Sequence, residues 1–333
     1  MKKIINDPTT VVTEALKGVA LAHADLVTVH HDPDFITRAD GPIQGKVAIV
    51  SGGGSGHEPL AGGYVGPGGL DAAVPGAVFT SPTPDQILAA TQAADGGAGV
   101  VHLVLNYTGD ILNFETAAEL ADAEDINVQA VVIDDDVAVK DSTWTAGRRG
   151  VGGAIPWYKI TCAAAARGDD LDAVVAISKR VVANVRTMGM ALTPCTVPHS
   201  GEPSFTLAED EMEIGIGVHG EPGRERTKLT SANEIVATLL GSVVEDLPFE
   251  RGDNTLLFVN GMGGTPSIEL YLAYNAAREF LAERGIEVTR SLVGNYFTSL
   301  EMQGMSISLL KLDDELTELW DAPINTAAMR RGV

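Results

Sequence analysis

Short apolar runs alternate with segments of helical apolar spacing through the first half of the chain. Each run has the length of a strand and ends at a polar or glycine-rich turn, which favours a mostly parallel sheet with helices on its faces. The predicted strands are 46–50, 71–79, 99–105 and 127–133, and the predicted helices are 8–24, 86–94 and 113–123, the second introduced by Pro84.

The second half repeats this alternation after a segment rich in turn residues. Residues 189–206 contain three prolines together with glycine and serine, which is typical of a crossover between domains. Beyond it, strands are predicted at 211–218, 255–259, 287–292 and 306–311, and helices at 232–244 and 267–284. We therefore expect an α/β fold with two α/β domains, 1–188 and 189–333, each a mostly parallel or mixed sheet flanked by helices.

The composition argues against a membrane-spanning protein, a secreted protein and a metal site at the cysteines. Hydrophobic residues make up 45% of the 333 residues, enough for sizeable cores, but no apolar run has the length of a membrane span. The N-terminal residues lack the long apolar stretch of a secretory signal, so the expected location is the cytoplasm. Cys162 and Cys195 have no metal-ligand spacing and are expected to be small buried residues.

The chain is strongly acidic, with a formal net charge of −22. Such a charge repels nucleic acid and anionic membranes, which makes both poor candidates for partners. The acidic residues are dispersed and only nine lysines occur, a pattern that favours adaptation to a salt-rich cytosol, where screening removes the self-repulsion. An ordinary acidic enzyme is the alternative.

The first predicted strand leads into the glycine-rich sequence Ser-Gly-Gly-Gly-Ser-Gly, residues 51–56, followed by His57. The sequence lacks the Gly-Lys-Ser/Thr ending of a P-loop, so a glycine turn and a phosphate cradle are both compatible with it. An imidazole at the carboxyl end of a strand is well placed for proton transfer near neutral pH.

Two further polar residues come after predicted strands. Asp110 closes the loop after 99–105, and a carboxylate there could converge with His57 on one hydroxyl, although a lone Asp is more often a turn or cap residue. His219 follows 211–218, and a lone histidine is more often structural. Asp134, Asp135 and Asp136 are consecutive and cannot all face one ion from a strand end, so we expect a solvated loop and no metal.

Seven ordered blocks together resemble the dihydroxyacetone-binding subunit of dihydroxyacetone kinases, from about residue 10 to about residue 325. Any one glycine loop would be unspecific, whereas the ordered set is highly specific. The blocks are SGGGSGHEP at 51–59, FTSPTPD at 79–85, NYTGDILNFE at 106–115, DDDVAVKDSTWTAGRRG at 134–150, CTVPHSGEPSFTL at 195–207, EIGIGVHGEPG at 213–223 and WDAP at 320–323.

The resemblance implies a role for each candidate residue. His219 matches the histidine that adds to the substrate ketone and forms a covalent hemiaminal, which would explain discrimination against glycerol, a molecule without a carbonyl carbon. Asp110 matches the acid/base residue for the attacking hydroxyl, and His57 matches its companion. The backbone of Gly54, Ser55 and Gly56 would line the substrate. The family usually has lysine where this chain has Leu105, which removes one expected contact to a substrate hydroxyl.

The resemblance also implies partners and an assembly. The substrate would be dihydroxyacetone, the fold two α/β domains and the assembly a homodimer. Single-chain members carry a helical ATP-binding domain, and this sequence stops at Val333, so we expect a separate nucleotide-binding kinase subunit that holds ADP or ATP with magnesium, while this chain itself binds no cofactor. A phosphohistidine carrier protein would recharge ADP; free ATP is the other donor. The rival hypothesis is a non-catalytic dihydroxyacetone sensor that contacts a transcription regulator; keeping His57, Asp110 and His219 together favours the enzyme.

Overall fold

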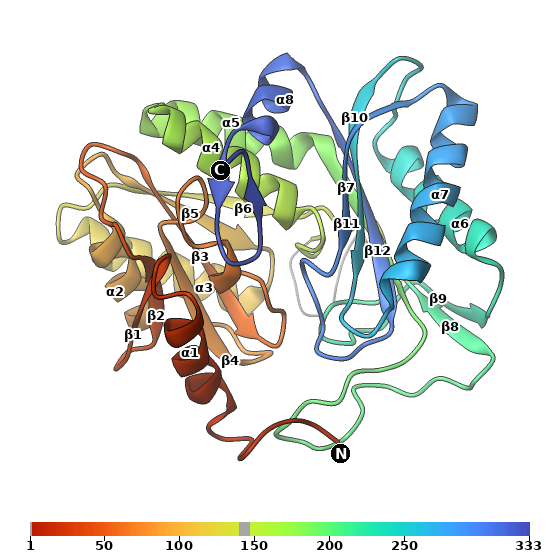
Figure 1. Cartoon of the computed structure of the whole chain (residues 1–333), viewed down its shortest axis with the longest axis horizontal. Coiled ribbons are helices and arrows are strands. Elements are labelled where there is room, and N and C mark those ends of the chain that lie inside the picture. The colour runs from red at the N-terminus through yellow and green to blue at the C-terminus, as the bar shows by residue number, and fades with distance from the viewer. Residues whose placement is uncertain (1, 140–146) are drawn as a thin grey trace.

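Two six-stranded sheets stand side by side in the computed structural model, which describes residues 2–139 and 147–333 (Figure 1). In the first sheet β3, β4, β5 and β6 run parallel and β1 and β2 are antiparallel additions at one edge. Its spatial order is β1 (Val27–His30), β2 (Phe35–Arg38), β4 (Ala72–Val78), β3 (Ala48–Ser55), β5 (Val100–Leu105) and β6 (Val128–Ile133).

The second sheet is mixed, with one parallel pair, β10 with β11, and otherwise antiparallel neighbours. The expectation of an α/β fold with mostly parallel or mixed sheets is therefore confirmed. Its spatial order is β11 (Glu287–Gly294), β10 (Asn254–Gly261), β12 (Gly304–Lys311), β7 (Val185–Ala191), β8 (Glu211–Ile214) and β9 (Glu225–Lys228).

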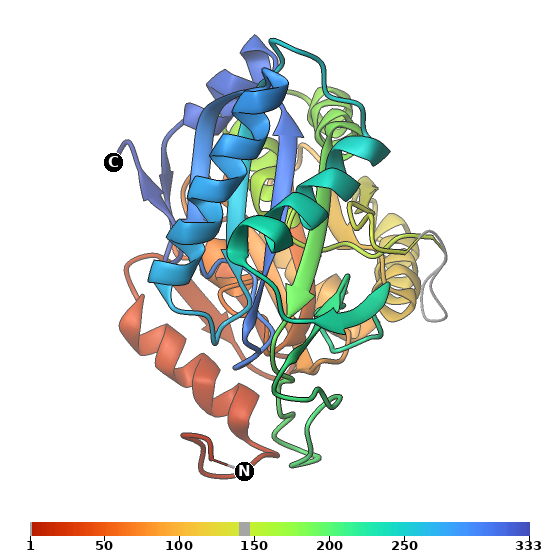
Figure 2. The ribbon, with the colours of Figure 1, turned by 90° about the vertical axis from the view of Figure 1, so that its right-hand side faces the viewer.

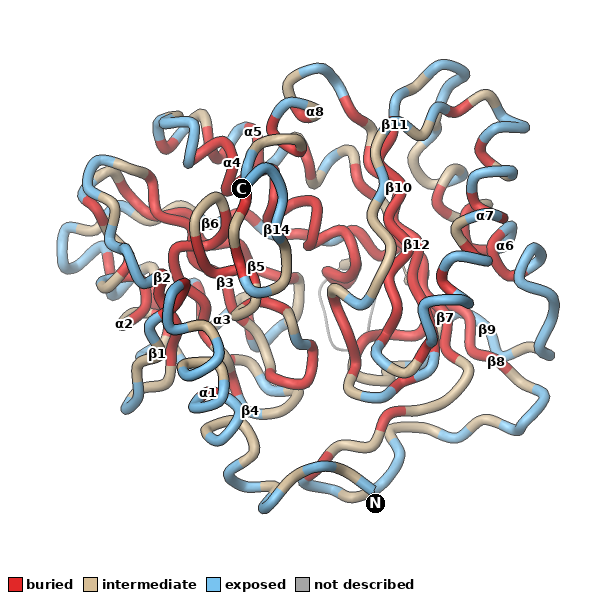
Figure 3. The backbone as a smooth tube through the Cα atoms, viewed as in Figure 1, coloured by how far each residue is buried: buried red, intermediate tan, exposed pale blue. Residues whose placement is uncertain are grey.

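Helices cover both sheets and also fill the space between them. On the first sheet lie α1 (Val11–Ala22), α2 (Pro84–Ala94) and α3 (Thr108–Asp122). On the outer face of the second lie α6 (Ala232–Asp246) and α7 (Ser267–Arg284), as the turned view shows (Figure 2). Between the sheets lie α4 (Ala154–Arg167) and α5 (Leu171–Asn184), whose buried side chains share one core with residues of both sheets. Burial is concentrated in these central layers (Figure 3).

Helix α4 shows why the sequence pattern missed this central layer. Twelve of its residues are buried, from Ala154 to Ala165, so it has no polar face and no helical apolar period. Its length and position were decided by packing on both sides. By contrast, α2 carries a local start signal, because Thr83 and Gln86 form a capping box and Pro84 occupies the first turn.

The glycine-rich segment is not the loop that the sequence suggested. Gly52, Gly53 and Gly54 are part of β3 and pair in register with Val74, Pro75 and Gly76 of β4. A Cβ atom at Gly52 would lie 2.6 Å from the Val74 carbonyl oxygen, so glycine here permits close approach of backbone rather than flexibility. Only Gly56, with φ of +100°, needs the left-handed region, and it turns the chain toward His57.

The C-terminal segment returns from the second sheet to the first. Helix α8 (Asp314–Asp321) packs on α4, and the short hairpin of β13 (Ile324–Asn325) and β14 (Arg330–Arg331) follows it. A 3-10 turn, η1 (Gly62–Tyr64), lies beside this hairpin, where Ala328 donates its amide hydrogen to the Gly63 carbonyl. The division into two domains at 188/189 remains a proposal. This boundary falls within β7, a strand of the second sheet, and the C-terminal segment packs back on the first part of the chain. None of the helices in the described part of the chain is long and apolar enough to cross a membrane.

Candidate functional site

A pocket of about 370 Å³ opens where the carboxyl ends of β3, β4 and β5 meet a turn of the second unit. We use the word unit for each six-stranded sheet together with the helices and turns attached to it. Parallel strands bring their carboxyl ends to one edge, and the turn between β8 and β9 closes the pocket from the other unit. The lining residues are Gly54, Phe79, Ser81, Tyr107, Thr108, Gly109, Asp110, His219 and Glu221. Two of the three predicted catalytic residues, Asp110 and His219, thus line one pocket.

Asp110 lies in the first turn of α3, which begins five residues earlier than the sequence indicated. The segment Thr108–Gly109–Asp110 has weak helix propensity, but a carboxylate in a first helical turn is favoured by the helix dipole. Its Oδ2 accepts a 2.8 Å hydrogen bond from Ser81 Oγ, and its buried Oδ1 has no partner among the described residues. Burial raises the pKa of Asp110 to about 6, against the effect of the Ser81 hydrogen bond.

His57 does not line the pocket itself, and its ring is fixed by a residue of the second unit. Its Nδ1 donates a 2.7 Å hydrogen bond to the carbonyl of Thr298, a geometry that leaves Nε2 with the lone pair. That Nε2 is buried and has no hydrogen-bond partner among the described residues. Burial, and secondarily the charge of His219, lowers the pKa of His57 to about 3, so the ring stays neutral at pH 7.

His219 sits on a tight turn that a glycine makes sharp. Gly220 has φ of +83°, and the Gly220 amide donates to the Gly217 carbonyl at 3.0 Å. The ring Nδ1 lies 2.7 Å from Glu221 Oε1, and the His219 amide donates to Glu221 Oε2 at 2.9 Å. Ser299 Oγ donates to the Val218 carbonyl, which ties the turn to the β11–β12 connection.

Aromatic rings enclose the His219 imidazole on several sides. Its centroid lies 4.8 Å from that of His57, 5.0 Å from Tyr107 and 5.1 Å from Phe79, all in edge-to-face arrangements. Phe79 also stacks on His57 at 4.8 Å. His57 and His219, which the sequence analysis selected separately, are therefore in contact although they come from distant segments of the chain.

The other predicted substrate-binding residues lie around the pocket without all facing it. Gly54 lines it, and a Cβ there would lie 2.6 Å from the Thr80 nitrogen, so glycine is needed. Ser55 Oγ donates to the Gly76 carbonyl at 2.7 Å, and the Gly56 amide donates to Glu58. Leu105 is 5% exposed and packs in the core shared by the two sheets, so it offers the pocket no polar contact.

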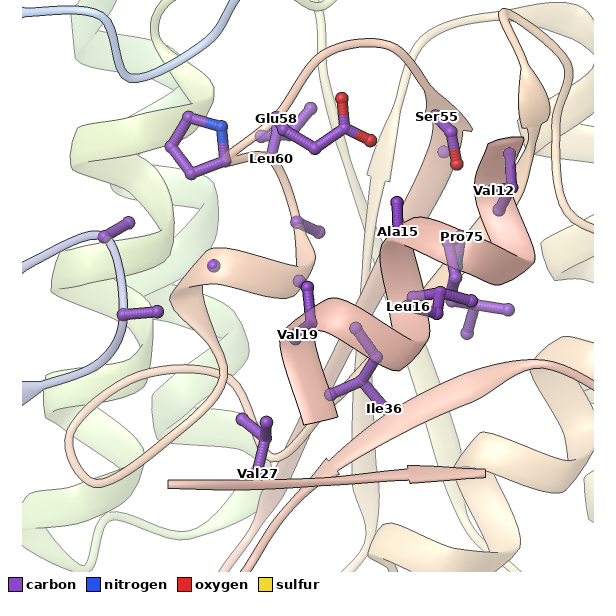
Figure 4. Close-up of a pocket in the computed structure, with 18 of the residues that line it drawn as sticks. Val12, Ala15, Leu16, Val19, Val27, Ile36, Ser55, Glu58, Leu60 and Pro75 are labelled. Atoms are coloured by element: carbon purple, nitrogen blue, oxygen red, sulfur yellow. The ribbon is translucent and has the colours of Figure 1, made fainter. Parts of the chain in front are cut away.

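A second, mainly apolar pocket of about 300 Å³ shares Gly54 and also borders Ser55 (Figure 4). It is lined by α1, β2, the 58–63 segment and residues 327–328. The figure shows Glu58 as the acidic side chain at this pocket, opposite aliphatic residues of α1. Because Asp110 and His219 border the other pocket, the chemistry belongs there.

The expectation that the aspartate triplet forms a solvated loop is wrong for two of its three residues, because Asp135 and Asp136 are buried and make structural contacts. Asp135 accepts hydrogen bonds from the amides of Val151 and Gly153, and Asp136 forms a buried ion pair with Arg149 at 2.7 Å. Asp134 is exposed. Among the residues with described positions, no group of three His, Cys, Asp or Glu side chains is placed to hold a metal ion. Residues 140–146 of the 134–150 block lie outside the described residues.

Several site residues escaped the sequence analysis although they lay within its motifs. Ser81 and Phe79 belong to FTSPTPD, Tyr107 to NYTGD, and Glu221 to VHGEPG. Glu221 carried one local signal, since a carboxylate two residues after a histidine across a Gly turn can return to its ring. The contact of Ser81 with Asp110 had no such signal, because it depends on two neighbouring strand ends.

Comparisons with known proteins give one consistent result. The profile of the Dak1 domain matches residues 17–328. A relative from Escherichia coli (strain K12), named "PEP-dependent dihydroxyacetone kinase, dihydroxyacetone-binding subunit DhaK", is 49% identical over 356 residues and covers 100% of both chains.

Two solved structures are also similar. The "Dihydroxyacetone kinase operon co-activator Dha-DhaQ" has a TM-score of 0.89 and 34% identity, covering 95% of this chain and 96% of its own. The dihydroxyacetone kinase of C. freundii, native form, has a TM-score of 0.87 and 29% identity, covering 99% of this chain and 60% of its own.

Proposed function

The chain belongs to the Dak1 domain family, and from this premise we propose that it is the dihydroxyacetone-binding subunit of a dihydroxyacetone kinase. The observation that carries the proposal is the pocket bordered by both Asp110 and His219, where one buried oxygen of Asp110 has no hydrogen-bond partner among the described residues. The full-length relative named as such a subunit supports it. The reaction class is phosphoryl transfer to a hydroxyl of a short ketose.

We propose that His219 anchors the substrate through its ketone. The Nε2 lone pair forms a bond to the carbonyl carbon, and the π electrons of the C=O bond move to oxygen, which takes a proton; the product is a hemiaminal. The anchored sugar then presents a terminal hydroxyl to Asp110. This converts delivery of the hydroxyl into a positioned, effectively unimolecular event.

Asp110 is better suited than His57 to take the proton of that hydroxyl. With a pKa near 6, Asp110 is mostly ionised at pH 7 and still basic enough to accept a proton as the hydroxyl attacks. His57, with its pKa near 3, is a weak base, and its buried Nε2 is suited to accept a hydrogen bond from substrate. We therefore propose His57 as the companion residue that orients a substrate hydroxyl, with the backbone of Gly54, Ser55 and Gly56 nearby.

The phosphoryl group is proposed to come from a separate nucleotide-binding subunit. The sequence has no Gly-Lys-Ser/Thr phosphate loop, and the relative from Escherichia coli that matches over its full length is named as a subunit. That partner would hold ADP or ATP with magnesium, and a phosphohistidine carrier would recharge bound ADP. The relative from Escherichia coli, whose name begins "PEP-dependent", favours the carrier route.

The purified chain alone, given dihydroxyacetone, magnesium and ATP, is expected not to turn over. Phosphoryl transfer needs a group that positions the nucleotide, and only the partner is proposed to supply it. The measurement is steady formation of dihydroxyacetone phosphate, with and without a nucleotide-binding subunit from a split-type dihydroxyacetone kinase. Sustained product from the highly purified chain alone would contradict the need for a partner.

A non-catalytic sensor is the second candidate, because the operon co-activator has the same fold at 34% identity. A sensor needs the ligand pocket but has no use for a base beside the ligand's hydroxyl. The buried, unpartnered Asp110 oxygen therefore favours the kinase subunit. In the reconstitution above, tight dihydroxyacetone binding without any product in the presence of a working partner would favour the sensor.

We also propose that the protein is adapted to a salt-rich cytosol. At net charge −22, unscreened repulsion between dispersed carboxylates should destabilise the compact state at low ionic strength. The melting temperature is expected to rise from dilute buffer to molar potassium chloride. A flat profile would leave an ordinary acidic protein and would not affect the enzymatic proposal. The cytoplasm and a homodimer remain the proposed location and assembly, the latter measurable by light scattering.

A further inference from the structure

Glu221 is the only carboxylate within hydrogen-bonding distance of the His219 ring among the described residues, and it was absent from the sequence-based site. Both of its oxygens are used on the same neighbour: Oε1 lies 2.7 Å from the ring Nδ1 and Oε2 accepts from the His219 amide at 2.9 Å. The carboxylate therefore fixes both the ring and the backbone of one residue. Its side chain is 14% exposed, so little solvent competes for these contacts.

The surroundings favour an ionised Glu221. Burial by itself would raise the pKa of this carboxyl, but the hydrogen bond from the His219 ring, the positive charge of that ring whenever it is protonated and the nearby Arg149 hold it at about 2. An ionised carboxylate can only accept, so the hydrogen in the 2.7 Å contact belongs to Nδ1. In the neutral form of the ring, the lone pair is then left on Nε2.

Gly217 makes room for this arrangement. A Cβ at this position would lie 2.0 Å from Glu221 Oε2 and 2.6 Å from Arg149 Nη1, so a side chain could not coexist with the carboxylate where it stands. The Arg149 guanidinium is itself fixed, by Asp136 and by the Gly215 carbonyl at 2.8 Å. The turn, Arg149 and Gly217 together fix the position of the Glu221 carboxylate.

We propose that Glu221 is the positioning residue for His219: it keeps the proton on Nδ1, leaves Nε2 as the nucleophile, and balances the charge that the ring acquires in the hemiaminal. The inference rests on the proposed covalent function. When Nε2 bonds to the ketone carbon, the carbonyl π electrons move to oxygen, which takes a proton from solvent. Nδ1 keeps its proton, so the ring becomes a cation beside the Glu221 anion, and one proton is taken up overall.

The test uses the tautomer of His219 in the free, nitrogen-15-labelled full chain. At a pH at which the ring is neutral, the wild-type His219 should show a protonated Nδ1 and an unprotonated Nε2, its signals assigned by their absence in His219→Ala. In Glu221→Gln the neutral amide can donate to Nδ1 instead, so the Nε2-protonated tautomer should appear. Affinity for dihydroxyacetone should fall on the order of 10- to 100-fold, the range for losing a hydrogen bond to a charged group.

Two further variants separate positioning from folding. Gly217→Ala keeps Glu221 but displaces its carboxylate, and it should shift the tautomer in the same direction. Glu213→Gln is the matched control, since Glu213 supports the same turn through the Gly223 amide and Arg226 without touching His219. It should leave the tautomer unchanged.

The tautomer measurements test the role of Glu221 independently of whether His219 forms a hemiaminal. An Nε2-protonated ring in the wild-type chain, or an unchanged tautomer with wild-type affinity in Glu221→Gln, would overturn it. The tautomer is measured without substrate, so failure to form a hemiaminal would refute the proposed anchoring step and still leave the positioning of the ring decided.

Discussion

Replacement of Asp110 by Asn is expected to lower kcat by about 10²- to 10⁴-fold, the usual contribution of a general base. Binding of dihydroxyacetone should change little, because the proposed anchor is His219 on the opposite unit. The amide keeps the shape of the carboxylate and can still accept the Ser81 hydrogen bond at one oxygen. What it loses is the ability to take a proton from the attacking hydroxyl.

The pH dependence follows from the raised pKa of Asp110. Because the ionised form is the active base, wild-type kcat/KM, which reports the free protein, should rise with pH through about 6 and then level off, and this limb should be absent from the residual activity of Asp110→Asn. The measurement is kcat/KM for dihydroxyacetone against pH in the reconstituted system with saturating partner subunit.

Stability provides the control for that variant. Since the folded-state pKa of Asp110 is raised above its unfolded value, its contribution to stability is fully present below the unfolded pKa and is lost as pH rises through about 6. At pH 7.5 Asp110→Asn should therefore melt no lower than wild type. A lost kcat with a lower melting temperature would point to damage of the fold, and a retained kcat would remove Asp110 from the role of base.

Replacement of His219 by Ala is expected to weaken dihydroxyacetone binding by about 10²-fold or more, because the covalent bond supplies the positioning of the sugar. Discrimination against glycerol should collapse at the same time, since glycerol has no carbonyl carbon and depends only on the remaining contacts. With dihydroxyacetone labelled by carbon-13 at its carbonyl, saturation of the wild-type chain should replace the ketone resonance by that of a tetrahedral carbon.

The histidine variants make this result specific. The tetrahedral resonance should be missing in His219→Ala and present in His31→Ala, which removes an exposed histidine that does not line the pocket. A ketone resonance that persists in the saturated wild-type complex would exclude the hemiaminal. A tetrahedral resonance that survives in His219→Ala would move the anchor to another residue.

Much of the first sheet and its chemistry was visible in the sequence. Val100–Leu105 is an apolar run interrupted by one histidine, His102, and the residues that follow its carboxyl end are polar, so Asp110 could be singled out and placed at one edge of a parallel sheet. The family resemblance, carried by ordered motifs, added His219. The hydrophobic periodicity did not predict elements that are buried on both faces, such as α4, or strand residues that are glycines, as in β3.

The sequence by itself determined many of the elements, the α/β class and the residue types that end several strands, because these depend on local periodicity and turn chemistry. Only the tertiary structure decided which of those residues meet. The contact between His57 and His219, the hydrogen bond from His57 to the Thr298 carbonyl and the burial that moves the pKa of Asp110 all arise from packing between segments far apart in the chain. Local patterns record which face of an element is apolar, whereas the distance between two units is set by the whole packed core between them.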